Sequence, residues 1–193
     1  MTHQFLAAVH PGSDPGHIPL PELMCARLDG EVYPLGACWC PIDEVESPAL
    51  RAASLGPLVP PRGIVERASA AWVYGVLPEP AVHELCVDVH ARAHLPPSAH
   101  VHIREVTCPA ADTRLLAGIR VTSPLRTAVD LARWSVETDE SALTQVLGQL
   151  LTYGGFSDET EARLACACRA TPHRARALAR FDLVAARHRS GAL

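Results

Sequence analysis

The chain has 193 residues, of which 48% are hydrophobic, so it is long enough and apolar enough to bury the core of one ordinary domain. All 17 basic residues are arginines, which excludes enzymes that use a Schiff-base lysine, a phosphate-loop lysine or a lysine-dependent nuclease site. No run of about 18 apolar residues is present, so a transmembrane helix is not expected. The first 16 residues show no secretory pattern, so we expect a cytoplasmic protein with reduced cysteines.

The net charge of −4 hides an uneven distribution of charges along the chain. Residues 1–50 hold seven acidic residues against a single arginine, Arg27, whereas residues 162–193 hold seven arginines against a single acid, Asp182. This pattern predicts a basic surface for an anionic partner near the carboxyl end. The alternative is that acids and arginines only solvate different surfaces.

Residues 1–46 are predicted to form an N-terminal unit. A lead-in rich in proline and glycine precedes a short helix over 20–28 and a two-stranded hairpin over 31–40. A helix followed by a hairpin is the order found in winged-helix proteins, so we interpret this unit as a short winged-helix remnant. Its acidic character opposes contact with phosphates.

The middle of the chain alternates helices and strands. Ser47-Pro48 predicts the start of a helix that runs to about Leu55, and a short strand over 64–66 leads to a helix over 69–74 that Gly75 ends. Residues 84–90 and 100–106 alternate apolar and polar side chains, which is typical of strands with one buried face. The intervening residues 91–99 predict an antiparallel hairpin with an open loop.

Residues 118–132 are predicted to form a strand that leads directly into an amphipathic helix. Thr122 or Ser123 is expected to be the N-cap, and Pro124 fits the first helical position. Arg126 and Asp130 then lie four residues apart on one face, where a structural ion pair is more common than a catalytic one.

Three further helices are predicted between residues 139 and 189. Asp139 is expected to cap the first, which Gly154-Gly155 ends; Ser157 is expected to cap the second, and Thr171-Pro172 to start the third. The predicted fold class is therefore α+β, with a small antiparallel or mixed sheet and a helical C-terminal part. We expect residues 47–193 to form this domain.

The last predicted helix carries the candidate binding residues. At about 100° per residue, Arg176, Arg180 and Arg187 fall within roughly 40° of arc, and Arg169 and Arg174 flank them. Such a stripe predicts a surface for phosphates or an acidic partner, with a merely solvated helix face as the alternative.

A metal site is a lesser possibility. One strand face carries Cys86, Asp88 and His90, and a face of the next strand carries His100 and His102, so an antiparallel hairpin would let these ligand-type side chains converge. However, Cys38-x-Cys40 and Cys166-x-Cys168 lack zinc-site spacing, and alternation alone explains a polar sheet face. We expect no metal and no cofactor. The sequence also lacks G-x-S-x-G, H-E-x-x-H and a glycine-rich phosphate loop.

Two blocks of sequence carry a family resemblance. They are Ala-Ser-Ala-Ala-Trp-Val-Tyr-Gly at 68–75 and Gly-Ile-Arg-Val-Thr-Ser-Pro-Leu-Arg-Thr-Ala-Val-Asp-Leu-Ala at 118–132. With the two blocks in this order, the chain resembles the AbiEi-type antitoxins of type IV toxin–antitoxin systems. The resemblance extends over about residues 20–133 and more loosely through the helical tail.

The resemblance implies a protein without enzymatic activity. Members of this family bind promoter DNA to repress their own operon, and they counter a nucleotidyltransferase toxin without forming a stable complex with it. An N-terminal winged helix typically reads the DNA, but here that unit is short and acidic. We therefore expect an antitoxin-like regulator that binds its own promoter through the basic C-terminal surface. A protein-interaction module that docks an acidic partner without DNA is the alternative, and a metal-dependent enzyme is a lesser one.

Overall fold

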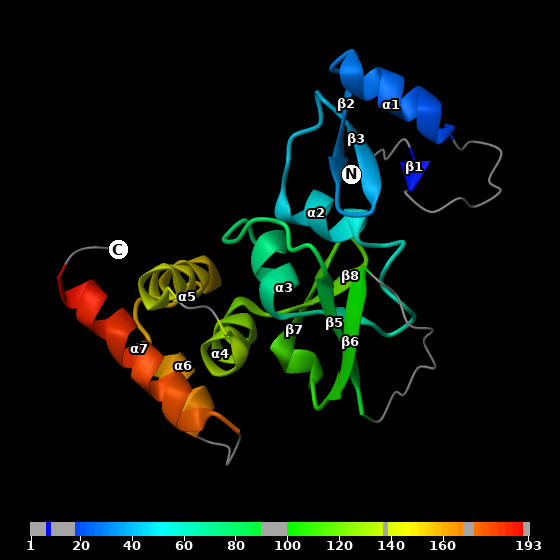
Figure 1. The fold of residues 1–193 in the computed structure, drawn as a ribbon. Helices are drawn as coiled ribbons and strands as arrows, with labels where there is room; N and C mark the ends of the chain where they lie inside the picture. Colours follow the sequence, from blue (N-terminus) through cyan, green and yellow to red (C-terminus); the bar gives the residue numbers. More distant parts are fainter. Residues whose placement is uncertain (1–6, 9–17, 90–99, 137–138, 168–171, 191–193) are drawn as a thin grey trace.

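The computed structural model describes residues 7–8, 18–89, 100–136, 139–167 and 172–190 of the chain (Figure 1). The N-terminal unit contains α1 (Leu20–Leu28) and the hairpin of β2 (Val32–Leu35) and β3 (Cys38–Pro41), which confirms the predicted helix and hairpin. A short strand, β1 (Ala7–Ala8), lies in the expected lead-in and pairs antiparallel with β3, so this small sheet has the order β1-β3-β2.

The main sheet is mixed and has the strand order β6-β5-β4-β8-β7. Its strands are β4 (Ile64–Val65), β5 (His83–Asp88), β6 (Val101–Val106), β7 (Thr113–Leu116) and β8 (Ile119–Thr122). The pairs β4–β8 and β5–β6 are parallel, whereas β4–β5 and β7–β8 are antiparallel. A one-turn 3-10 helix, Ala110–Asp112, leads into β7.

The expectation of an antiparallel hairpin for β5 and β6 is wrong. His83 lies opposite Val101 and Asp88 lies opposite Val106, so the two strands run in the same direction. Both segments are strands as predicted, but the alternation of side chains does not report strand direction. Cys86 is also fully buried, because Ile64 and Cys108 pack with it on the face that was expected to be polar.

Three of the helices begin at the capping residues that the sequence predicts, whereas α3, predicted over 69–74, runs two residues further toward the amino end. Ser47 caps α2 (Pro48–Ser54), Ser123 rather than Thr122 caps α4 (Pro124–Trp134), and Asp139 caps α5 (Glu140–Gly154). Gly155 ends α5 in the left-handed conformation, with φ 85°. The remaining helices are α3 (Arg67–Val73), α6 (Thr160–Ala167) and α7 (Arg174–Arg189).

Two predicted helix starts shift toward the carboxyl end. Helix α6 begins at Thr160 because the Asp158 carboxylate, and not Ser157, accepts the Thr160 backbone N–H at 2.8 Å. Helix α7 begins at Arg174, after His173 takes a left-handed conformation with φ 58°.

One apolar core joins the main sheet to the helices. It includes Leu85 and Val121 from the sheet, Val73 from α3, Leu147 from α5 and Phe181 from α7. Figure 1 shows α4 to α7 gathered beyond one side of the main sheet, with the N-terminal unit near the other end of the molecule. Within the described residues, no helix is both long enough and apolar enough to cross a membrane.

Candidate functional site

The start of α4 is held by an ion-pair network. The Arg126 guanidinium lies 2.7 Å from Asp130 through Nε and 2.7 Å from Asp112 through Nη1. Burial alone would lower the pKa of Arg126, but these two carboxylates raise it above its ordinary value. At the start of the same helix, the buried Thr122 and Thr127 hydroxyls lie 2.7 Å apart. The network ties α4 to the loop before β7, which agrees with a structural role for Arg126 and Asp130.

Beside this network, three guanidinium groups surround one indole ring. Arg67, Arg104 and Arg133 lie 5.4, 5.8 and 5.6 Å from the ring centroid of Trp134, within the range of cation–π attraction. The His173 imidazole meets the same ring edge-on at 4.8 Å, immediately before α7. We call Arg67, Arg104, Arg133 and Trp134 the arginine–tryptophan cluster.

Two buried carboxylates hold the cluster together. Glu66, only 1% exposed, accepts two hydrogen bonds from Arg104, one of them at 2.8 Å from Nη2 and the other from Nε. Asp130, also 1% exposed, lies 3.7 Å from Arg133 and 3.8 Å from Arg104. Burial would lower the pKa of Arg104, but its hydrogen bonds to Glu66 raise it. The guanidinium groups of the cluster are therefore positively charged although they are largely shielded from water.

Arg67 is the member of the cluster with an unusual backbone conformation. Its backbone has φ 47°, a left-handed conformation that is uncommon for a residue other than glycine. One of its terminal nitrogens lies 3.3 Å from Glu84, while its buried Nε has no hydrogen-bond partner in the described structure. Such strain persists only where the surroundings fix the residue, and here the surroundings are Trp134, Glu66 and Glu84.

No sequence pattern predicted the arginine–tryptophan cluster. Its members come from α3, β6 and α4, and only the fold brings them together. The available signals were an arginine on the polar face of a strand and an Arg-Trp pair at the end of an amphipathic helix. Neither signal is specific enough to predict a site.

The arginines of the expected stripe on α7 have different surroundings in the structure. Arg174 and Arg176 are exposed, and no hydrogen bond or ion pair within 4 Å joins either of them to another described residue, although the positive charge of Arg176 helps to lower the pKa of Glu140. The Arg187 side chain donates to the Ser141 backbone carbonyl at 3.0 Å. Arg169 lies outside the described residues.

Arg180 departs from the expected exposed stripe. It is only 5% exposed, and its guanidinium lies 2.6 Å from Glu140 and donates to the backbone carbonyls of Ala132 and Ser135 at 3.0 and 3.1 Å. Helical periodicity places Arg180 relative to Arg176 but not relative to α5, which covers it. Its guanidinium fastens α7 to the start of α5 and to the end of α4, so the expectation of an exposed Arg180 is wrong.

The candidate metal ligands do not converge. Because β5 and β6 are parallel, His102 lies opposite Glu84 and Arg104 lies opposite Cys86, so His100 and His102 are at the other end of the strand pair from Asp88. His90 lies outside the described residues. Among the residues that the structure describes, no group of three or more histidine, cysteine or acidic side chains is placed to hold a metal ion.

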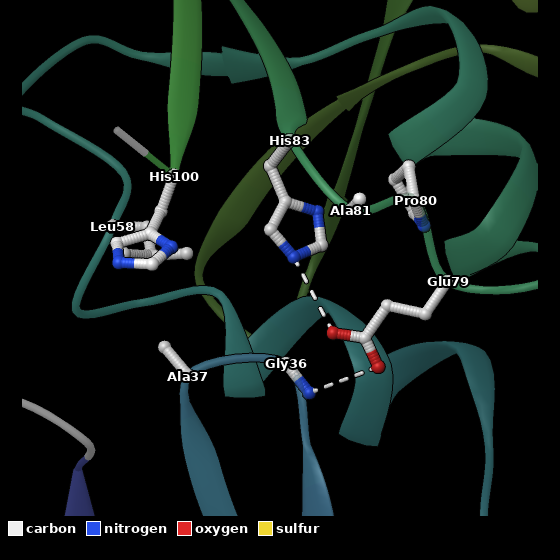
Figure 2. Close-up of a pocket in the computed structure, with 8 residues that line it drawn as sticks. All are labelled: Gly36, Ala37, Leu58, Glu79, Pro80, Ala81, His83 and His100. Atoms are coloured by element: carbon white, nitrogen blue, oxygen red, sulfur yellow. Dashed lines mark hydrogen bonds and ion pairs between the residues drawn. The ribbon is translucent and has the colours of Figure 1, made fainter. Parts of the chain in front are cut away.

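A pocket of about 580 Å³ lies between the N-terminal hairpin and the start of β5, as Figure 2 shows. Its Glu79 carboxylate lies 3.4 Å from the His83 Nε2 and accepts the Gly36 N–H at 3.5 Å. On the far side of the ring, the Ser69 hydroxyl lies 3.2 Å from the His83 Nδ1.

The Ser69–His83–Glu79 arrangement has the order of a catalytic triad but not its accessibility. Ser69 is fully buried, and its oxygen accepts the Glu84 backbone N–H at 2.8 Å. A substrate carbonyl would have to reach that oxygen for nucleophilic attack. The arrangement therefore links α3, β5 and the N-terminal hairpin, and it offers no accessible nucleophile at Ser69.

Comparison with known proteins supports the predicted resemblance. Residues 63–181, which are more than half of the chain, match the family model of the AbiEi antitoxin C-terminal domain. Among solved structures, the chain is similar to a crystal structure of the RV2827C protein from Mycobacterium tuberculosis, with 19% identity and a TM-score of 0.36 over 81% of this chain and 71% of that one. Comparison with curated proteins gave no match. The match to residues 63–181 includes β4 to β8, the whole arginine–tryptophan cluster and the first half of α7, and by this match the chain belongs to the family of AbiEi antitoxin C-terminal domains.

Proposed function

We propose that this chain is a non-catalytic, antitoxin-like transcriptional regulator that binds the DNA of its own promoter through a basic C-terminal surface. The observation that carries the proposal is the pair of exposed arginines at the start of α7, Arg174 and Arg176, which no described carboxylate neutralises by a direct contact. Guanidinium groups bind phosphate oxygens in a planar, bidentate manner. Membership in an antitoxin family makes a regulator the natural interpretation of such a surface.

The surroundings of Arg174 favour this end of α7. The preceding residue, His173, lies against Trp134, so the arginine–tryptophan cluster lies directly beside the start of the helix. Arg133 is held there with its pKa lowered, first of all by burial, and its Nε donates to the Pro172 carbonyl at 3.2 Å. Arg169 precedes the helix and Arg187 lies three turns after Arg176, and we include both in the proposed surface. Arg180 acts by holding α7 in place.

In this proposal the N-terminal unit does not bind DNA. Glu22, Asp29 and Glu31 are exposed in or next to α1, and the one basic residue there is Arg27. Negative side chains at this density would repel the phosphate backbone. We therefore assign DNA contact to the C-terminal helices.

The antitoxin family implies a toxin partner. We propose that this toxin is a nucleotidyltransferase-like enzyme of a type IV system, that it is countered without a stable complex, and that both proteins act in the cytoplasm. A nucleotidyltransferase reading frame directly next to this gene would support the pairing.

Binding to the promoter tests the proposal. Fluorescence anisotropy with a labelled promoter fragment is measured over a series of salt concentrations for the wild type and for a variant with Arg174→Ala and Arg176→Ala. Loss of two phosphate contacts should weaken binding and reduce the slope of log K against log salt by about two. The matched control carries Arg114→Ala and Arg120→Ala, two exposed arginines on β7 and β8, and should retain the wild-type slope.

Two outcomes would contradict the proposed surface. Equal affinity and slope for the wild type and the α7 variant would remove α7 from the interface. Equal loss in both variants would indicate a nonspecific effect of net charge. The alternative function is a module that docks an acidic protein through the same arginines, and it predicts capture of a co-transcribed protein that nuclease treatment does not abolish.

A further inference from the structure

The pocket beside the N-terminal hairpin has the size and the fixed walls of a small-molecule site. Its volume of about 580 Å³ lies within the range of about 300–1,000 Å³ that is typical of ligand pockets. Ala37 and His83 in its wall are buried, and Leu58 packs against the main apolar core. These residues are held by the fold itself, so the pocket does not need a ligand in order to form.

The described lining combines apolar side chains with one carboxylate. Four apolar residues form part of the wall: Ala37, Leu58, Pro80 and Ala81. Glu79 is the only aspartate, glutamate or arginine among the described lining residues. An inorganic ion would make no use of the apolar walls. The lining therefore suits a molecule that has an apolar body and a polar group at one end.

The Glu79 carboxylate has no short hydrogen bond to another described residue. It lies 3.4 Å from the His83 Nε2 and 3.5 Å from the Gly36 nitrogen, as Figure 2 shows. Charge-assisted hydrogen bonds to a carboxylate are shorter, at about 2.7–2.9 Å. Because the Glu79 side chain is 38% exposed, a donor that enters the pocket can reach its oxygens.

Both nitrogens of the His83 ring face protein groups. Nδ1 faces the Ser69 hydroxyl, and Nε2 faces Glu79. The Ser69 oxygen already accepts the Glu84 N–H, so the Ser69 proton is available to Nδ1, and a neutral ring then carries its own proton on Nε2. The His83 N–H donates to the His100 carbonyl at 2.9 Å, which holds the two histidines side by side. With a neutral His83, Glu79 gives its end of the pocket a negative charge.

We propose that this pocket binds a small organic cation, with an ammonium or amidinium group at Glu79 and a compact apolar body against Leu58 and Pro80. Such a group supplies the short, charge-assisted hydrogen bond that the described residues do not give Glu79. The ligand touches Gly36 and Ala37 of the hairpin on one side and the residues before β5 on the other, so its binding stabilises this junction. The proposal does not depend on DNA binding, because the proposed DNA contacts lie on α7.

Four small probes of similar shape test which charge the pocket recognises. Benzamidine and benzylamine are cationic, benzyl alcohol is neutral and benzoate is anionic. Isothermal titration calorimetry of the full chain should show saturable binding of the two cations, and the other two probes should bind about tenfold more weakly or not at all. In amide NMR spectra the Gly36 signal should shift with the cations, because its N–H faces Glu79.

Two variants change the pocket without replacing a buried residue. Glu79→Gln keeps the shape of the side chain and removes its charge, so it should weaken binding of the cations about tenfold or more. Ala81→Trp places a large ring at an exposed position of the wall and should block the pocket for both cations. The matched control is Glu161→Gln in the first turn of α6, which should bind the cations like the wild type.

Three outcomes would overturn the proposal. They are the absence of saturable binding of both cations at millimolar concentrations, equal affinity of Glu79→Gln and the wild type for benzamidine, and equal affinity of the wild type for benzamidine and benzoate. Circular dichroism and the urea midpoint of each variant show whether it is folded, so that lost binding is distinguished from lost folding.

Discussion

Arg180 and Arg176 lie one turn apart on α7 and have different physical roles. Arg180 is buried against Glu140 and two backbone carbonyls, whereas Arg176 is exposed. Both are arginines on the same side of one helix, and the sequence offers no distinction between them. The difference arises from α5 and the end of α4, which cover only the Arg180 position.

This contrast predicts different effects on stability. Arg180→Ala leaves two backbone carbonyls and a carboxylate without their donor, and we expect a loss of about 2–3 kcal/mol in the free energy of unfolding. The value lies below that of a fully buried pair, because Glu140 is 47% exposed and can be rehydrated. Arg176→Ala is the matched control and should stay within about 0.5 kcal/mol of the wild type. Urea denaturation of both variants measures this, and equal losses would contradict the assigned structural role of Arg180.

At the scale of elements, local signals and long-range pairing differ in how well the sequence predicts them. Ser47, Ser123, Asp139 and Gly155 each set a helix boundary through their own neighbours, and the structure confirms all four. The parallel pairing of β5 with β6 depends on how the chain crosses between them, and alternation of side chains carries no such information. The arginine–tryptophan cluster could not be predicted for the same reason, because its members meet only through that sheet and α4.

The docking of α7 on α5 should depend on pH through Glu140. A hydrogen bond from Arg180, together with its positive charge, holds the pKa of Glu140 below its ordinary value of 4.5. A carboxyl group whose pKa is lower in the folded state adds stability above its unfolded pKa, and this contribution is lost as the pH falls through the folded value. Glu140→Gln should therefore be less stable than the wild type at pH 7, by about 1 kcal/mol or less for a half-exposed pair, and the difference should shrink at pH 3.

Urea denaturation at the two pH values provides the measurement. Glu161→Gln is the matched control, since Glu161 occupies the first turn of α6 as Glu140 occupies the first turn of α5. The control should show no comparable change with pH. A difference between Glu140→Gln and the wild type that is the same at pH 7 and pH 3 would contradict the linkage.

At the scale of the whole molecule, the N-terminal hairpin is continuous with the main core. Leu35 and Cys40 are buried in the same apolar cluster as the sheet and the C-terminal helices. The Ala37 N–H donates to the Ser54 carbonyl at 3.0 Å, and the Cys38 thiol donates to the same carbonyl at 3.4 Å. Gly36 is required at this junction, because its φ is 56° and a Cβ atom there would lie 2.4 Å from the Ser54 hydroxyl oxygen. We expected residues 1–46 and 47–193 to be separate domains, yet these contacts favour cooperative unfolding of both parts.

Two single-tryptophan variants can test whether the parts unfold together. Trp72 is replaced by Phe in both; one variant retains Trp39, which lies in the N-terminal unit, and the other retains Trp134, which lies in the arginine–tryptophan cluster. The apolar core includes residues on both sides of the boundary between residues 46 and 47, so unfolding of either part would expose buried surface of the other. We therefore expect the same urea midpoint from both tryptophan probes and from far-ultraviolet circular dichroism. If the Trp39 transition came at clearly lower urea, the N-terminal unit would be a separate folding unit, and α1 would be a mobile attachment and not a rigid extension of the core.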